Sequence, residues 1–256
     1  MTARRRRTLV ALVLVAAVCL VVWAAGLPSV RGIDAYWADD SAPVTRAGVE
    51  FRGDTAAVTI TPATDGRVSV RATGRYSGSR PRVSVTEDRN RMLVIVECFA
   101  EPTRLCELEA EVRMPPQLSL LATTRGGPMR VEGLTAPVIL NSESAPVVAS
   151  SLSGAVQVRT MSGPFTAERL HSSRVAVRSD SGAVTAQFNR APSSLSVATG
   201  QVPVRMIIPR ADGGYRLSID SGGAPNSVAL TEQPDSPRRI AVRTTGGEVL
   251  LQPATG

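Results

Sequence analysis

Apolar and polar residues alternate along most of the chain after residue 55, and the alternation comes in short, similar units. Two segments show it clearly: AVQVRTMSGPFTAERL and RVAVRSDSGAVTAQF each place an alternating run before a Ser-Gly turn and another run after it. Alternation with a period of two is typical of β-strands with one buried face. The unit therefore predicts a strand, a tight turn and a second strand.

This unit occurs seven times between residues 118 and 252, at intervals of 18 to 23 residues. We align the copies on one turn position, here called the marker: Gly127, Ala145, Gly163, Gly182, Val202, Ala224 and Gly247. Three residues before the marker every copy carries a hydroxyl group, and we call these side chains the hydroxyl column: Thr124, Ser142, Thr160, Ser179, Thr199, Ser221 and Thr244. We expect these hydroxyls to form a ladder that satisfies backbone groups of the turns.

Repeats of about twenty residues cannot bury an apolar face alone, so neighbouring repeats must stack and share one core. The sequence therefore predicts an all-β fold with a β-solenoid of about seven strand-turn-strand repeats at 118–252. A β-sandwich of short hairpins is the alternative, because regular strand spacing also suits that fold and the last intervals lengthen. Residues 253–256 form a short tail.

Residues 51–117 show alternating runs that do not follow the repeat. The segments AAVTI and RVSVRA flank a turn at Asp65 and Gly66, and RVSVTED and RMLVIVE flank Arg89 and Asn90. We expect both pairs to form antiparallel hairpins that lead into the repeats. The polar stretch at 28–50 predicts a stalk, a linker or a first edge strand.

The amino end combines a basic tail with a long apolar run. Arg4 to Arg7 lie within residues 1–8, and an uncharged run follows at 9–27. A helix of that length rises roughly 28 Å, close to the hydrocarbon thickness of a bilayer. The preceding arginines predict a single-pass transmembrane helix with a cytoplasmic N-terminus and an extracytoplasmic domain. The alternative is a signal peptide cleaved near VVWAAG, with secretion of the rest.

Charge and composition argue against several function classes. The net charge is +7, but beyond the apolar run 25 arginines face 22 acidic residues, which leaves about +3. That balance does not indicate a nucleic-acid partner. One histidine, three cysteines and no nucleotide-binding motif predict neither a metal site nor a cofactor.

The motifs that suggest catalysis have simpler explanations. IDSGGAP is similar to the nucleophile stretch of trypsin-like serine proteases, but Ser221 belongs to the hydroxyl column and His171 has no carboxylate context in the sequence. A β-helix enzyme acting on polysaccharides is an alternative, although the nine acidic residues of 118–256 show no dense cluster. We therefore predict a non-catalytic protein. The Arg-Gly-Asp tripeptide at 52–54 is interpreted as an exposed turn.

The segment VECFAEPTRLCELEAEVRMPPQLSLLATTRGGPMRVEGL resembles the bacterial putative-adhesin family, a domain of unknown function built from β-strand repeats. Its cysteine pair, the alternating strand that ends at Pro115 and the turn at Gly126 and Gly127 match that family. The resemblance covers roughly residues 50–252 and departs at Val202, where TGQVPV replaces the Ser-Gly turn. It implies an extracytoplasmic β-repeat protein that is anchored to the membrane.

We expect a membrane-anchored binding or scaffold module whose partner is an envelope component, either a protein or an anionic polymer. The alternative is an accessory component of cell-envelope stress sensing. In that case a neighbouring membrane protein is required, because a cytoplasmic tail of about eight residues is too short to signal.

Two pairs of residues are candidates for specific roles. Cys98 and Cys106 flank the loop FAEPTRL between two alternating strands, and an oxidising compartment predicts a disulfide between them. Two free cysteines packed beneath the loop are the alternative. Arg159 and Arg178 lie four residues before their markers, where side chains point outward. We expect them to be neighbours on adjacent coils that bind an anion, the alternative being two solvated surface arginines.

Overall fold

The computed structural model describes residues 32–98 and 104–254. The chain divides into two compact units, 1–34 and 35–256, and the strands belong to the second unit, apart from Asp34 at the start of the first strand. The described residues form strands and contain no helix, so the all-β prediction is confirmed. No described helix is long and apolar enough to cross a membrane. The basic tail and the apolar run at 9–27 lie outside the described residues.

The strands form two mixed sheets, here called sheet A and sheet B. Sheet A contains, in spatial order, β1 (Asp34–Pro43), β4 (Arg67–Tyr76), β7 (Cys106–Met114), β3 (Ala57–Pro62), β9 (Met129–Glu132), β11 (Val147–Ser150), β13 (Phe165–Leu170), β15 (Val184–Phe188), β17 (Val204–Ile208), β21 (Val249–Pro253) and β19 (Asn226–Val228). Sheet B contains β18 (Arg216–Asp220), β20 (Arg239–Thr244), β16 (Ser194–Thr199), β14 (Arg174–Ser179), β12 (Val156–Thr160), β10 (Val138–Ser142), β8 (Ser119–Thr124), β2 (Gly48–Gly53), β6 (Arg91–Glu97) and β5 (Arg82–Asp88).

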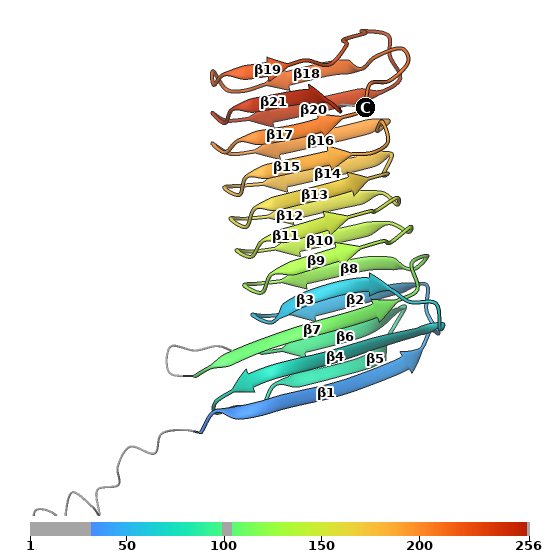
Figure 1. Ribbon diagram of the computed structural model, residues 1–256, viewed down its shortest axis with the longest axis vertical. Coiled ribbons are helices and arrows are strands. Elements are labelled where there is room, and N and C mark those ends of the chain that lie inside the picture. Colours follow the sequence, from blue (N-terminus) through green and yellow to red (C-terminus); the bar gives the residue numbers. More distant parts are fainter. Residues whose placement is uncertain (1–31, 99–103, 255–256) are drawn as a thin grey trace, which may run out of the picture. The chain divides into compact units, whose positions relative to one another are not determined.

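Each predicted repeat gives its first strand to sheet B and its second strand to sheet A. Equivalent strands of neighbouring repeats pair in parallel and in register, as Val138 does with Val156 in sheet B and Val147 with Phe165 in sheet A. Every repeat is thus one coil that adds one strand to both sheets, and we call the coils from β8 to β21 the repeat stack (Figure 1).

The core lies between the two sheets and follows from the alternation. Leu140 and Phe165 are fully buried, whereas the residues between core positions face solvent. Burying one such side chain stabilises the fold by about 1.5 to 3 kcal/mol. This core contains the rings of Phe51, Phe165 and Phe188. Val, Leu and Ala side chains fill the rest of the thin layer between the sheets, so the fold needs few aromatic residues.

An additional coil precedes the seven repeats. Strands β2 and β3 pair in parallel with β8 and β9, and Phe51 stands opposite Ala122 in the same register as the repeats. Its turn position is Ala56, but Gly53 occupies the place of the hydroxyl, opposite Thr124. The additional coil is not visible in the sequence because it lacks the hydroxyl of the column. Residues 63–118 also separate it from the first of the seven repeats.

One of the two predicted hairpins is present and the other is not. Strands β5 and β6 pair antiparallel across the turn at Arg89 and Asn90, as expected. AAVTI and RVSVRA do not pair with each other, because β7 lies between β3 and β4, parallel to the first and antiparallel to the second. Strand β3 belongs to the additional coil, and its two edges pair with β9 and with β7. The hairpin prediction was wrong because no edge of β3 is left for β4.

The segment predicted as stalk, linker or edge strand contains β1, which lies at the edge of sheet A. Strand β2 begins at Gly48, so the strand region starts before the boundary expected at residue 51.

The last two repeats are stacked in reverse of their order in the chain. Strand β20 lies between β16 and β18, and β21 lies between β17 and β19. Ile240 consequently pairs with Leu195 on one side and with Leu217 on the other. The long connections at 209–215 and 229–238 give the chain enough length to skip one level and return, which explains the longer intervals in this part of the sequence.

Candidate functional site

The hydroxyl column closes the turns of the repeat stack. In six of the seven repeats the buried hydroxyl donates a hydrogen bond to the carbonyl of its own marker, over 2.6 to 3.0 Å. The exception is Thr199, whose hydroxyl contacts the carbonyl of Gly200 at 3.5 Å. This repeat carries Val202 at the marker, where the sequence departs from the Ser-Gly turn. The column therefore has a structural role.

A hydroxyl ladder between coils lies two residues further along the chain. The side chains of Ser144, Ser162 and Ser181 donate to the carbonyls of Arg125, Glu143 and Met161 on the preceding coil, over 3.1 to 3.3 Å. The hydroxyl column satisfies backbone groups of the turns, as expected, and Thr124 also donates to the Asp54 carbonyl of the preceding coil over 3.2 Å. The signal for the second ladder was the serine immediately before the marker in three consecutive repeats.

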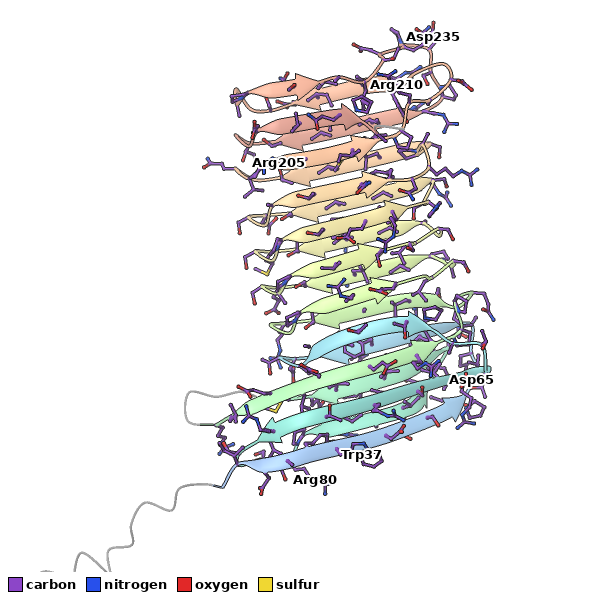
Figure 2. All side chains as sticks on the ribbon, viewed as in Figure 1. Trp37, Asp65, Arg80, Arg205, Arg210 and Asp235 are labelled. Carbon is purple, nitrogen blue, oxygen red and sulfur yellow. A yellow bond between two sulfur atoms is a disulfide. The ribbon has the colours of Figure 1, made fainter. Side chains whose placement is uncertain are left out.

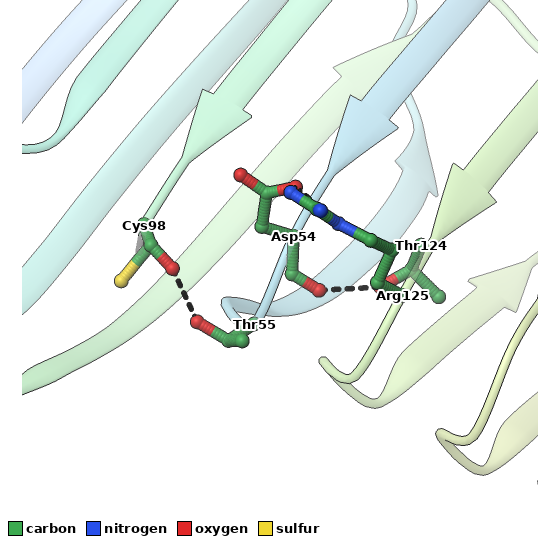
Figure 3. A network of polar contacts seen from close by, with 5 residues as sticks. All are labelled: Asp54, Thr55, Cys98, Thr124 and Arg125. Carbon is green, nitrogen blue, oxygen red and sulfur yellow. Dashed lines mark hydrogen bonds and ion pairs between the residues drawn. The ribbon is translucent and has the colours of Figure 1, made fainter. Parts of the chain in front are cut away.

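Cys98 and Cys106 form a disulfide with a Cα–Cα distance of 5.7 Å, as predicted. Both sulfur-bearing side chains are buried, and the bond links the end of β6 in sheet B to the start of β7 in sheet A. Thr55 donates a hydrogen bond to the carbonyl of Cys98 (Figure 3). The disulfide thus fixes the two sheets beside the additional coil.

The Arg-Gly-Asp tripeptide lies at the end of β2 in the additional coil, where Arg52 is exposed and Asp54 begins the turn. Arg52 and Gly53 belong to β2, and the Arg52 guanidinium pairs with Glu50 at 2.7 Å. The carboxylate of Asp54 accepts a hydrogen bond from Arg125 Nε over 2.9 Å, and this bond raises the pKa of the Arg125 guanidinium (Figure 3). The tripeptide is consequently held by neighbouring coils.

The residues that resemble a serine protease site are not brought together. Ser221 follows β18 in the outermost coil and donates to the carbonyl of Ala224 at 2.6 Å. His171 follows β13 and lines a separate hollow of about 750 Å³ with Asn189 and Arg210. In sheet A, β15, β17 and β21 lie between the coils of these two residues. Within the described residues no group of three or more His, Cys, Asp or Glu side chains is placed to hold a metal ion.

Arg159 and Arg178 are neighbours, as the repeat spacing predicts. They are direct register partners on β12 and β14, and both side chains are exposed on the outer face of sheet B. Parallel strands place such partners about 4.8 Å apart at the backbone. The two residues line a surface hollow of about 350 Å³ together with Asn141, Glu143 and Asp180. We call this hollow the arginine site.

The other arginines in the same outward column have carboxylate partners. Arg52 pairs with Glu50, and Arg243 pairs with Asp220 at 3.5 Å. Among the described residues no carboxylate lies within 4.0 Å of a guanidinium nitrogen of Arg159 or Arg178. Like charges opposite each other on neighbouring strands are mildly destabilising. Arg159 and Arg178 are thus two adjacent positive charges without a carboxylate within 4.0 Å among the described residues, as are Arg216 and Arg239 on β18 and β20.

The remaining charges of the arginine site restrict what can bind there. Glu143 and Asp180 follow the hydroxyl column in their repeats, so they lie on the side of the hollow nearest the turns. A bound anion must avoid these carboxylates and contact the guanidinium groups on the side away from the turns. Guanidinium donors in a planar fork suit phosphate and carboxylate oxygens.

Comparisons with known proteins give little support for a family assignment. No protein-family model matches the chain, and no curated protein matches it. A solved structure described as a "putative cell adhesion protein" from Clostridium sporogenes aligns with 86% of this chain and 100% of its own, at 8% identity and a TM-score of 0.32. This similarity is too distant to assign the chain to a family.

Proposed function

We propose that this chain is a non-catalytic binding module that lies outside the cytoplasm, is anchored by the apolar run at 9–27, and binds an anionic polymer of the cell envelope. We further propose that its repeat stack is a β-solenoid that serves as a rigid scaffold for the arginine site. The observation that carries the proposal is the in-register pair of Arg159 and Arg178, which have no carboxylate within 4.0 Å among the described residues.

The geometry of the stack suits a ligand with repeated charges. Outward side chains on successive coils are about 4.8 Å apart, and the parallel register fixes them on a backbone with little freedom to rearrange. The backbone positions of both arginines are therefore fixed close together before the ligand arrives, which lowers the entropy cost of binding. A polymer with closely spaced phosphates or carboxylates can contact both groups at once.

The disulfide supports the proposed location. Structural disulfides persist in oxidising compartments and are rare in the cytosol of most bacteria. The buried bond between Cys98 and Cys106 therefore agrees with a domain outside the cytoplasm. This argument holds both for an anchored protein and for one secreted after cleavage of a signal peptide.

Binding of the full-length chain in detergent to inorganic polyphosphate and to polygalacturonate tests the proposal. The two polymers present phosphate and carboxylate groups, respectively. We expect the double variant Arg159→Ser/Arg178→Ser to bind at least one of them about tenfold to a hundredfold more weakly at low salt, because two charge-assisted contacts are lost. Thermal melting checks that the fold is unchanged.

The matched control is Arg190→Ser/Arg210→Ser. These arginines are exposed in the connections after β15 and β17, so the control removes the same charge without touching the arginine site. We expect it to reduce binding by less than about threefold, because distant exposed charges are screened. Equal losses in the two double variants, or unchanged binding in Arg159→Ser/Arg178→Ser, contradict the proposed site.

A third variant tests the direction of the electrostatic effect. Asp180→Asn removes a carboxylate that lines the arginine site. We expect tighter binding to the same polymer, because an unfavourable negative charge is lost. Weaker binding in this variant indicates that the carboxylate contributes to the contact, contrary to the proposal.

A further inference from the structure

The outermost coil of the repeat stack has one unpaired side. Within the described part of the chain, β18 pairs only with β20, and β19 pairs only with β21 (Figure 1). Leu217, Ile219 and Val228 occupy inward positions of this coil but are only partly buried. Leu195 and Val197, at the same positions of an inner coil, are 1% and 2% exposed. Among the described residues, no further coil therefore covers this end of the core.

The backbone of β18 shows which polar groups face the open side. The N–H of Arg216 donates to the carbonyl of Arg238 next to β20, whereas the N–H and the carbonyl of Tyr215 bond to Thr231 and Gln233 on the opposite side. Backbone groups alternate sides along a strand. The N–H and C=O groups of Leu217 and Ile219 consequently face the open side, beyond the point where residues 231–233 cover the edge.

The sequence of β18, RLSID, is self-complementary when two copies run antiparallel about Ser218. In that register Arg216 stands opposite Asp220 of the second copy, and Leu217 stands opposite its Ile219. We propose that the edge of β18 binds the same edge of a second copy of this chain. A pairing of this kind is isologous, so every contact occurs twice about a two-fold axis through Ser218.

The backbone and the side chains agree with this register. The two Leu217–Ile219 pairs are hydrogen-bonded pairs, because their N–H and C=O groups face the partner strand, and together they form four backbone hydrogen bonds. Arg216, Ser218 and Asp220 are exposed on the outer face, where opposite charges lie close enough to interact. The partly buried leucine and isoleucine meet their counterparts on the inner face.

The present contacts of the two charged residues leave room for this pairing. Asp220 pairs with Arg243 at 3.5 Å and accepts a hydrogen bond from the N–H of Gly222 over 3.2 Å, and the side chains of Asp220 and Arg243 are 61% and 78% exposed. Arg216 donates from Nε to the carbonyl of Pro234 over 2.5 Å, so its terminal nitrogens can still reach a carboxylate. In the pair, each Asp220 gains a second guanidinium, and each Arg216 gains a carboxylate.

The opposite end of the sheets is not suited to the same association. Strand β1 carries Asp34, Asp39 and Asp40, and charged residues on an edge strand oppose pairing with another chain. Asp40 also accepts a hydrogen bond from the N–H of Val85 on β5 over 2.7 Å, which ties the two edge strands of this end together. The edge of β18 carries one charge of each sign, so it is complementary to the same edge of a second copy.

Cysteine cross-linking tests the register directly. In the full-length chain with Cys19→Ser, so that no native thiol outside the disulfide is present, Ser218→Cys places the two new thiols at the two-fold axis. Their Cα atoms are then about 4.5 Å apart, within the range that a disulfide spans. We expect mild oxidation in detergent to convert most of the protein to a covalent dimer.

The matched control is Ala241→Cys, because Ala241 pairs with Ser218 from the adjacent inner strand and is exposed on the same face. We expect this variant to form at least tenfold less dimer. Adding Asp220→Arg to Ser218→Cys must lower the dimer yield at least tenfold, and the further change Arg216→Asp must restore it. Equal yields for the two cysteine variants, no loss with Asp220→Arg, or no restoration by the charge swap contradicts the proposal. A cross-linked product with a mass other than twice that of the chain also contradicts it.

Discussion

Replacing one hydroxyl of the column by a methyl group tests whether these residues hold the turns. Thr160 is 4% exposed, and its hydroxyl donates to the carbonyl of Gly163 at 2.8 Å. Thr160→Val keeps the shape of the side chain but leaves that carbonyl without its donor. The cost of an unsatisfied buried acceptor is about 1 to 3 kcal/mol. Valine offsets part of this cost by burying a methyl group, so we expect Thr160→Val to lower the free energy of unfolding by about 1 to 2 kcal/mol.

Thr199→Val is the matched control in the same column. Thr199 is also buried, but its hydroxyl contacts only the carbonyl of Gly200, at 3.5 Å, among the hydrogen-bonding groups of the described residues. A hydrogen bond at that distance is weak, so its removal costs little. We expect Thr199→Val to lower the free energy of unfolding by less than about 0.5 kcal/mol. Thr160→Ser retains the hydroxyl donor, so its free energy of unfolding should lie between that of the parent protein and that of Thr160→Val.

Urea unfolding followed by far-ultraviolet circular dichroism measures the difference. For a domain of this size the dependence of the unfolding free energy on urea is about 3 kcal/mol per molar, so Thr160→Val should lower the midpoint by about 0.3 to 0.7 M. An unchanged slope is required for the comparison, because long repeat arrays can lose cooperativity. Equal shifts for Thr160→Val and Thr199→Val refute the reasoning, since only one of these hydroxyls bonds its marker carbonyl.

The other stability predictions concern the disulfide, a turn and a buried phenol. Cys98→Ala/Cys106→Ala should lower the free energy of unfolding by about 2 to 3 kcal/mol in the chain-entropy model, and thiol labelling of the native parent before reduction should modify neither cysteine. Gly127→Ala should cost about 1 to 3 kcal/mol, because its Cβ would lie 1.9 Å from the Ala56 carbonyl oxygen, whereas Gly126→Ala should change the stability by less than about 0.5 kcal/mol. Burial raises the pKa of the Tyr215 phenol above its ordinary value, despite an opposing effect of Arg238, so stability should fall as the pH rises above about 10 and Tyr215→Phe should weaken that dependence. Labelling of both native thiols, equal costs for the two glycine variants, or an unchanged alkaline dependence contradicts the corresponding prediction.

The repeats, the arginine pair and the disulfide could be predicted from the sequence, because each depends on residues that lie close together in the chain or recur at a constant spacing. The hydroxyl column and the apolar alternation marked the seven repeats, because each turn needs a donor at the same place and each strand buries one face. The neighbouring positions of Arg159 and Arg178 followed from the constant spacing between repeats. The disulfide followed from two cysteines at the ends of strands joined by a short loop.

The remaining features depend on contacts between distant segments. Gly53 replaces the hydroxyl in the additional coil, and β7 separates β3 from β4, so neither the coil nor the sheet order is visible in the alternation. The reversed order of the last two coils is not visible either, because the first strands of both coils have similar alternation. The acidic residues of the arginine site were not recognised because they belong to a different column from the arginines.

Figure 2 shows that charged side chains project from many coils, so a direct map of the contact surface is needed to single out the arginine site. The most direct measurement is arginine modification by phenylglyoxal with and without saturating polyphosphate, quantified by mass spectrometry at each residue. We expect the polymer to slow modification of Arg159 and Arg178 at least fivefold, while Arg190 and Arg210 react at the same rates as in the free protein. Bound polymer with Arg159 and Arg178 reacting as fast as in the free protein would contradict the proposed function.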